Sequence, residues 1–168
     1  MNTEEIVHLA QLLGERLAGK GWMFSCAESC TGGLLAAAMT ETPGSSRWFD
    51  RGVVSYSNDA KQALLGVHPE TLERFGAVSE ETAMEMAAGV LATAPQSDFA
   101  VSTTGIAGPG GATPGKPVGM VCFGFATRTE EGLVTRAATR VFQGDRQEVR
   151  SAAVAFALTT ALEFNPLD

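Results

Sequence analysis

A serine that could act as a nucleophile, Ser29, stands where an apolar segment gives way to a glycine-containing turn. The turn reads Glu28-Ser29-Cys30-Thr31-Gly32-Gly33 and leads into an Ala/Leu-rich segment that predicts a helix. A hydroxyl at a strand-to-helix turn can attack a carbonyl carbon, and the unpaired amides of Cys30, Thr31 and Gly32 can hold the developing oxyanion. Alternatively, Ser29 or Thr31 only caps the helix, or the turn binds an anion.

A serine nucleophile needs a base, and Lys61 is the candidate that the sequence places best. It follows the second predicted strand, in the run Tyr56-Ser57-Asn58-Asp59-Ala60-Lys61. A lysine desolvated in a pocket has a lowered pKa and can accept a proton near neutral pH. Tyr56 can orient it through a phenolic hydrogen bond. The alternatives are a solvated helix lysine and a core tyrosine with an exposed hydroxyl.

The other reactive side chains fit this chemistry less well. His8 falls on the N-terminal helix and His68 in a predicted loop, so a Ser-His-Asp triad is not expected. Cys30 is the rival nucleophile, although a buried inert thiol is the more common state. The cysteines, Cys26, Cys30 and Cys122, are odd in number and lack CxxC spacing, so no zinc site is predicted.

Two further segments could bind an anionic ligand. The loop Gly105-Ile106-Ala107-Gly108-Pro109-Gly110-Gly111 lacks the Walker and GxGxxG patterns, but its glycines permit close approach to a phosphate or ribose. Arg146 follows Gly144 and Asp145 at a predicted helix start, where its guanidinium suits a phosphate oxygen. The alternative for Arg146 is a surface charge in the first helical turn.

The elements that position these residues alternate between strand and helix. A final hairpin with an acidic turn requires an antiparallel pair. Together they predict an α/β fold, a three-layer α/β/α sandwich with a mostly parallel mixed sheet of about five strands, one of them antiparallel. Ligands bind such sheets beyond the carboxyl ends of the strands, where both glycine-rich turns fall. The expected strands are 22–27, 52–56, 99–103, 118–126 and 133–142.

The helix boundaries follow from capping residues. Asn2 with Glu5, and Asp145 with Glu148, are spaced as capping boxes for the first and last helices. Asn58 or Asp59 can cap a helix that ends near Gly66, Pro69 suits the first turn of another, and Ser79 can cap a long helix to about residue 93. The helix after Ser29 is expected to end near Met39.

Length and charge narrow the class of protein. The 168 residues fit a single domain spanning 1–168, and 45% hydrophobic with 18% charged residues is typical of a globular protein. The net charge of −7 argues against non-specific nucleic-acid binding. The acidic N-terminus and short apolar runs predict neither a signal peptide nor a membrane span. We therefore expect a reduced, cytoplasmic, soluble protein.

Several motifs, in this order and spacing, resemble the CinA C-terminal domain family, and the resemblance extends over nearly the whole chain. Seven ordered motifs are much more specific than any one of them. They are Ala27-Glu28-Ser29-Cys30-Thr31-Gly32-Gly33, Gly44-Ser45-Ser46 with Trp48-Phe49, Tyr56-Ser57-Asn58 with Lys61, Gly76-Ala77-Val78-Ser79, Thr104-Gly105-Ile106-Ala107-Gly108-Pro109, Lys116-Pro117-Val118-Gly119 and Gly144-Asp145-Arg146.

The resemblance implies a function, because stand-alone members of this family are nicotinamide-nucleotide amidases. They hydrolyse the carboxamide of nicotinamide mononucleotide to nicotinate mononucleotide and ammonia, in pyridine-nucleotide salvage. By analogy Ser29 is the nucleophile, Lys61 the base, and Tyr56 and Thr104 lie close to the reacting amide. The glycine-rich segment, with Gly105, Ile106, Ala107 and Gly108, and Arg146 would hold ribose and phosphate.

The resemblance also bears on domains, cofactors and partners. Two-domain members carry an additional N-terminal domain linked to a metal-dependent pyrophosphatase activity, which is not expected from this chain. No metal or cofactor is needed, and a homodimer is expected. Two other classes remain open: a nucleotide-binding module without turnover, in which Ser29 is a helix cap, and a competence- or damage-associated protein with a DNA or recombinase partner.

Overall fold

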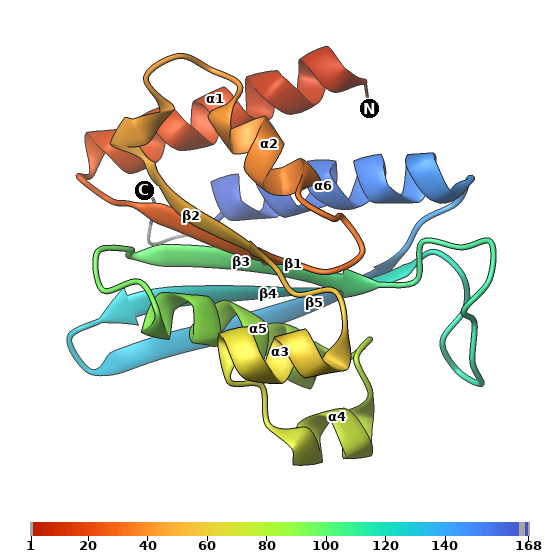
Figure 1. The fold of residues 1–168 in the computed structure, drawn as a ribbon. Helices are drawn as coiled ribbons and strands as arrows, with labels where there is room; N and C mark the ends of the chain where they lie inside the picture. Colours follow the sequence, from red (N-terminus) through yellow and green to blue (C-terminus); the bar gives the residue numbers. More distant parts are fainter. Residues whose placement is uncertain (1, 165–166, 168) are drawn as a thin grey trace.

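A five-stranded sheet in the order β2-β1-β3-β4-β5 forms the centre of the fold (Figure 1). The computed structural model describes residues 2–164 and residue 167. β1, β2 and β3 are mutually parallel, β4 runs antiparallel to β3, and β5 runs antiparallel to β4. The predicted mixed sheet with one antiparallel strand is confirmed. The strands are β1 (Phe24–Glu28), β2 (Phe49–Val54), β3 (Phe99–Gly105), β4 (Met120–Thr129) and β5 (Gly132–Val141).

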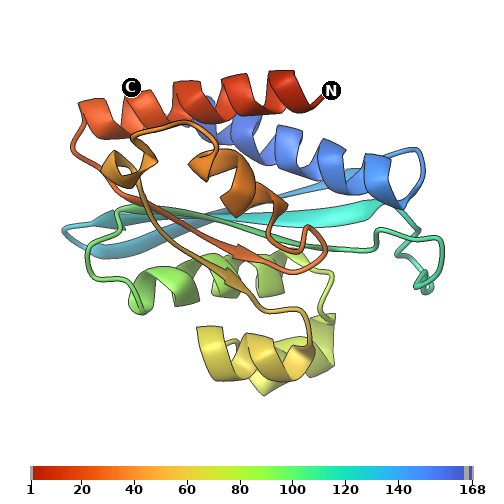
Figure 2. The same cartoon turned by 45° about the horizontal axis from the view of Figure 1, so that its top comes forward.

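Helices cover both faces of the sheet, which confirms the predicted three layers. α1, α2 and α6 lie on one face, and α3, α4 and α5 lie on the other (Figures 1 and 2). None of the described helices combines the length and apolar character needed to span a membrane. The helices are α1 (Thr3–Gly19), α2 (Leu34–Thr40), a 3-10 turn η1 (Ser45–Arg47), α3 (Asn58–Leu65), α4 (Pro69–Phe75), α5 (Glu80–Ala92) and α6 (Arg146–Leu162).

The central strand β1 divides its side chains between the two layers. All five of its residues are buried, and successive side chains on a strand point to opposite faces. Phe24 and Cys26 pack in the core beneath α1 and α6, whereas Ala27 packs in the core beneath α5. This alternation sets the directions of the two polar residues that follow, Glu28 and Ser29.

Capping residues define most helix ends as the sequence predicts. The capping boxes at Asn2 and Asp145 are both present, and the Ser79 hydroxyl accepts from the amide of Thr82. The predicted cap of α3 is wrong by one or two residues. Its N-cap is Ser57 rather than Asn58 or Asp59, because the Ser57 hydroxyl accepts from the Ala60 amide at 3.0 Å.

The second strand begins and ends earlier in the chain than predicted. β2 begins at Phe49 and ends at Val54, whereas residues 52–56 were expected. The earlier start follows from pairing with β1, in which Phe24 lies opposite Phe49. As a result Ser55 and Tyr56 lie in the connection beyond the strand and are free to contribute to a site.

Close packing of α3 on α5 depends on Gly89. A Cβ atom at this position would lie only 1.9 Å from the carbonyl oxygen of Leu65, the last residue of α3. Only glycine lets the two helices approach this closely. The contact places α3, which carries Lys61, against the rigid layer formed by α5.

Candidate active site

The predicted nucleophile is fixed to the sheet by an extension of the strand ladder. The Ser29 amide donates to the Thr103 carbonyl at 2.9 Å, and the Ser55 amide donates to the Glu28 carbonyl at 2.8 Å. Ser29 therefore lies between the ends of β2 and β3, at the carboxyl edge of the parallel strands. By the alternation along β1, its side chain is on the α3 and α5 side of the sheet, whereas Glu28 faces α2.

Ser29 and Lys61 are in direct contact. The Lys61 ammonium Nζ donates to Ser29 Oγ at 3.1 Å, to the Ser55 carbonyl at 3.1 Å and to the Tyr56 carbonyl at 2.9 Å. Lys61 is 1% exposed and Ser29 is 7% exposed. The solvated-lysine alternative is thus excluded, and an incoming molecule can reach the serine more easily than the lysine.

The surroundings of Lys61 favour its neutral form. Burial lowers the pKa of Lys61 below the ordinary value of 10.5, and the nearby Cys30 thiol acts weakly in the opposite direction. Among the described residues, no carboxylate forms an ion pair with this lysine. The amine is therefore easier to deprotonate than that of an exposed lysine.

Tyr56 contributes through its backbone, and the predicted phenolic contact with Lys61 is wrong. The Tyr56 carbonyl accepts from Lys61, and it also accepts from the Ser29 hydroxyl at 3.3 Å. The phenol instead accepts from Arg146, and the side chain is 59% exposed rather than part of the core. The cause is the early end of β2, which turns residue 56 outward.

The turn after Ser29 offers fewer amide donors than the sequence predicts. The Gly32 amide donates to the Ser29 carbonyl at 3.0 Å, so it is not the free donor that was expected. The amides of Cys30 and Thr31 donate to no other described residue. These two amides are therefore the candidates for holding a negatively charged oxygen beside Ser29.

Glu28 was not singled out by the sequence, yet its buried carboxylate organises the start of α2. It accepts from the amides of Leu35 and Ala36 at 2.9 and 3.0 Å, and from the Thr31 hydroxyl at 2.6 Å. The first free amides of α2 are thus occupied by the protein itself. The N-cap of α2 is Gly33, which has no side-chain cap, so neither Ser29 nor Thr31 is the helix cap.

Cys30 is an unsuitable nucleophile in this structure. The thiol is 5% exposed, and burial raises its pKa to about 12. Burial also raises the pKa values of Cys26 and Cys122. Since the thiolate is the reactive form of cysteine, all three thiols are held in the unreactive form near neutral pH.

The β3–β4 connection forms another side of the site. The Thr104 hydroxyl donates to the Ala77 carbonyl at 2.8 Å, which joins β3 to the turn before α5. Ile106 and Ala107 are buried, and Gly108 adopts a left-handed conformation with φ of 87°. Glycine suits that conformation, and it brings the Gly108 carbonyl within reach of α6.

Arg146 connects three segments at the mouth of the site. Its guanidinium donates to the Gly108 carbonyl at 2.8 Å and to the Tyr56 hydroxyl at 3.1 Å. The β2–α3, β3–β4 and β5–α6 connections therefore meet at this side chain, which is exposed. An exposed guanidinium where these connections meet can also donate hydrogen bonds to an anionic group.

Arg150 is a second arginine in the site, and the sequence reasoning missed it. Its guanidinium donates from Nε to the Cys30 carbonyl at 3.1 Å and from Nη2 to the Thr31 carbonyl at 3.4 Å. The sequence did contain a signal for Arg150. It lies four residues after Arg146, and this spacing puts both arginines on one face of α6.

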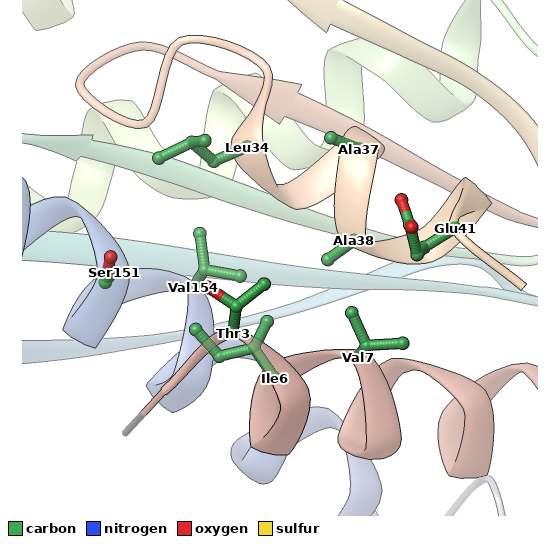
Figure 3. Close-up of a pocket in the computed structure, with 9 residues that line it drawn as sticks. All are labelled: Thr3, Ile6, Val7, Leu34, Ala37, Ala38, Glu41, Ser151 and Val154. Atoms are coloured by element: carbon green, nitrogen blue, oxygen red, sulfur yellow. The ribbon is translucent and has the colours of Figure 1, made fainter.

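An apolar groove of about 210 Å³ lies elsewhere, between α1, α2 and α6 (Figure 3). Ile6 and Val7 contribute from α1, Leu34 and Ala38 from α2, and Val154 from α6. Neither Ser29 nor Lys61 lines it. Within residues 2–164 and 167, no group of three or more His, Cys, Asp and Glu side chains is arranged to hold a metal ion.

The site as a whole is equipped for nucleophilic attack on a carbonyl group. It combines a hydroxyl, a buried amine in contact with it, two amides that donate to no other described residue, and an exposed guanidinium. Such an arrangement supports acyl transfer from an anionic substrate to the serine.

Comparisons with known proteins agree on one family. The sequence matches the family model described as the CinA C-terminal domain over residues 6–164. It is 53% identical over 162 residues to the nicotinamide-nucleotide amidohydrolase PncC of Enterobacter agglomerans, with 96% of both chains covered. It is 48% identical over 160 residues to the protein of the same name from Escherichia coli strain K12, covering 95% of this chain and 94% of that one. A crystal structure of a competence or damage-inducible protein from Enterobacter asburiae matches with a TM-score of 0.88 and 40% identity, covering 97% of this chain and 98% of that chain.

Proposed function

Because the chain belongs to the CinA C-terminal domain family, we propose that it is a nicotinamide-nucleotide amidohydrolase. It hydrolyses the carboxamide of nicotinamide mononucleotide to nicotinate mononucleotide and ammonia. Two relatives that are 53% and 48% identical are named nicotinamide-nucleotide amidohydrolases, which supports this substrate class. The structural observation that carries the proposal is the buried contact of 3.1 Å between Lys61 Nζ and Ser29 Oγ.

The hydrogen bonds around Lys61 explain how it can act as a base. A backbone carbonyl can only accept hydrogen bonds. In the neutral amine, the Ser55 and Tyr56 carbonyls take its two protons. The remaining lone pair then faces Ser29 Oγ and can receive the hydroxyl proton. The two carbonyls thus orient the base as well as bind it.

The reaction proceeds through an acyl-enzyme. Lys61 takes the Ser29 proton while Oγ bonds to the carboxamide carbon, and the oxyanion is held by the amides of Cys30 and Thr31. The tetrahedral intermediate collapses by breaking the carbon–nitrogen bond, and the protonated Lys61 gives its proton to the departing ammonia. Neutral Lys61 then removes a proton from water, whose oxygen bonds to the ester carbon. The bond between that carbon and Ser29 Oγ breaks, Lys61 returns its proton to Oγ, and the product acid loses its remaining proton to solvent and leaves as the carboxylate.

The remaining predicted roles concern the rest of the substrate. Arg146 binds the phosphate, and the loop containing Gly105, Ile106, Ala107 and Gly108 accommodates the ribose. Gly33 belongs to the turn that contacts the substrate beside Ser29, and Thr104 lies close to the reacting amide. The chemistry uses no metal or cofactor.

Two wider expectations belong to the same proposal. The enzyme acts in the cytoplasm, with which its three buried free thiols agree. It forms a homodimer in solution, as the family resemblance implies, and sedimentation equilibrium of the purified protein tests this.

Ser29→Ala is the decisive test of the proposed function. The variant should release ammonia from nicotinamide mononucleotide more slowly by three or more orders of magnitude, because the carbonyl carbon loses its attacking atom. It should still bind the substrate, as measured by calorimetry, since the phosphate contact is unchanged. Cys30→Ser is the matched control and should remain active.

Other outcomes would contradict the proposal in distinct ways. A wild-type protein that binds the nucleotide without releasing ammonia would be a binding module. Near-normal turnover by folded Ser29→Ala would assign the nucleophile to another residue.

A further inference from the structure

The guanidinium of Arg150 holds the turn that follows the nucleophile. Its two donated bonds end on successive carbonyls, those of Cys30 and Thr31. Among the described residues no carboxylate forms an ion pair with it. Its contacts with the described residues are these two backbone carbonyls. This half-buried guanidinium therefore controls the conformation of the turn at Cys30 and Thr31.

Peptide geometry shows what these two contacts orient. In a trans peptide the carbonyl and the N–H of the same unit point in opposite directions. Arg150 approaches from α6, on the α1, α2 and α6 side of the sheet. The Cys30 carbonyl points toward it, so the Thr31 N–H points to the opposite side, where Ser29 Oγ and Lys61 lie.

The second contact acts on the neighbouring peptide unit. The Thr31 carbonyl accepts from Arg150, and the amide of the same unit, that of Gly32, donates to the Ser29 carbonyl at 3.0 Å. Arg150 therefore also stabilises the closure of the turn onto Ser29. The space is limited, because a Cβ atom at Gly32 would lie 3.1 Å from Arg150 Nη2.

We propose that Arg150 is a positioning residue for the oxyanion-binding amides of this amidase, acting through the carbonyls of Cys30 and Thr31. The inference rests on the proposed function. Arg150 differs in role from Arg146, which reaches the mouth of the site and binds the substrate. A lysine is a poor replacement at position 150, because one ammonium cannot reproduce the planar pair of donors that meets two carbonyls.

The test is steady-state kinetics with nicotinamide mononucleotide for Arg150→Lys and Arg150→Gln. Misplaced oxyanion donors affect the transition state rather than the bound substrate. Both variants should lose about 100-fold in kcat, the loss that a misplacement of about 1 Å can cause. KM should change less than about twofold. Added methylguanidinium should partly restore kcat in Arg150→Ala.

Arg128 provides a matched control. Among the described residues, its guanidinium also donates only to backbone carbonyls, which are those of Leu91, Ala94 and Ser97. They lie at the far end of β4 from the site. Arg128→Gln should lower the free energy of unfolding while kcat stays near that of the wild type, and methylguanidinium should leave its kcat unchanged.

The outcomes separate this inference from the function on which it rests. If the wild-type protein has no amidase activity, the proposed function itself is contradicted. With an active wild type, a raised KM at constant kcat would make Arg150 a substrate ligand. A fully active Arg150→Lys would show that only its charge matters. Either of these results would overturn the positioning role.

Discussion

At the scale of single residues, the chemistry depends on where a lysine is buried. Lys61 stands in a position closed to water, with two carbonyls and one hydroxyl as its partners. Desolvation disfavours the ammonium, and no described carboxylate compensates for it. Burial of this side chain therefore shifts its protonation equilibrium toward the neutral amine, the form that can act as a base.

Lys61 should impose a pH dependence of definite sign. Activity should rise with pH through the lowered pKa of Lys61, because only the neutral amine accepts the Ser29 proton. Lys61→Arg should lose about 100- to 10,000-fold in kcat, since a guanidinium cannot give up its proton. Ammonia release measured across pH values, after folding and substrate binding are confirmed, checks both effects. Wild-type activity in Lys61→Arg would exclude Lys61 as the base.

The same shift predicts how stability depends on pH. Between the lowered pKa of the folded protein and the ordinary value of 10.5, the unfolded chain binds more protons at Lys61 than the folded chain does. The contribution of Lys61 to the free energy of unfolding therefore rises with pH in this window. Urea titrations of the wild type and Lys61→Met should differ in this slope.

Arg146 should affect binding of the phosphate more than catalysis. Its guanidinium lies at the mouth of the site rather than beside Ser29. Arg146→Ala should therefore raise KM for nicotinamide mononucleotide about tenfold or more with a smaller change in kcat. Free nicotinamide should be a poor substrate for the wild type. Equal cleavage of the phosphorylated and free compounds would refute the phosphate contact.

At the scale of secondary-structure elements, the geometry of the site is set by how closely helices and strands approach. α3 must place Lys61 against the end of β1, and it does so by resting on α5 at Gly89. α6 must place Arg150 against the turn after Ser29, and its capping box at Asp145 fixes where that helix begins. Contacts far from the reacting atoms therefore control the distances between them.

Gly89→Ala should damage both stability and activity. The added Cβ atom would overlap the Leu65 carbonyl oxygen at 1.9 Å, so α3 must shift away from α5. We expect a loss of about 1–3 kcal/mol in the free energy of unfolding, as is typical of overpacking. A displacement of about 1 Å at Lys61 can lower kcat by about 100-fold. Urea unfolding and ammonia release measure the two effects.

Gly19→Ala is the matched control for this substitution. A Cβ atom at Gly19 would meet no atom within 4 Å, and the residue lies in the last turn of α1. This variant should be as stable as the wild type or more so, because alanine has the higher helix propensity. An unchanged kcat in Gly89→Ala would show that the spacing between α3 and α5 does not control Lys61.

At the scale of the whole molecule, the sequence predicts the architecture better than it predicts contacts within the site. Apolar periodicity and capping residues are local patterns in the sequence. They therefore indicate the helices and strands, and with them the layers and the mixed sheet. The sequence predicts that Lys61 lies near Ser29 because ligand sites in such sheets lie beyond the carboxyl ends of the strands. The same rule does not predict that Lys61 bonds to the backbone carbonyl of Tyr56 rather than to its phenol.

The contributions of Glu28 and Arg150 could not be predicted in the same way. A carboxylate beside a serine suggests many roles, and its use as a cap for α2 depends on the direction of its side chain at the end of β1. Arg150 reaches the Cys30 carbonyl across 120 residues of sequence. Such long-range pairings are set by tertiary packing, which leaves no periodic signal in the chain.

The position of α6 late in the chain has a consequence for the timing of activity during protein synthesis. Ser29, Lys61 and Thr104 leave the ribosome before Arg146 and Arg150, because the chain emerges from its N-terminal end. A nascent chain that ends before α6 carries the nucleophile and the base but neither guanidinium. Under the function proposed here, the nascent chain reaches its full rate of nucleotide hydrolysis only after α6 has been translated.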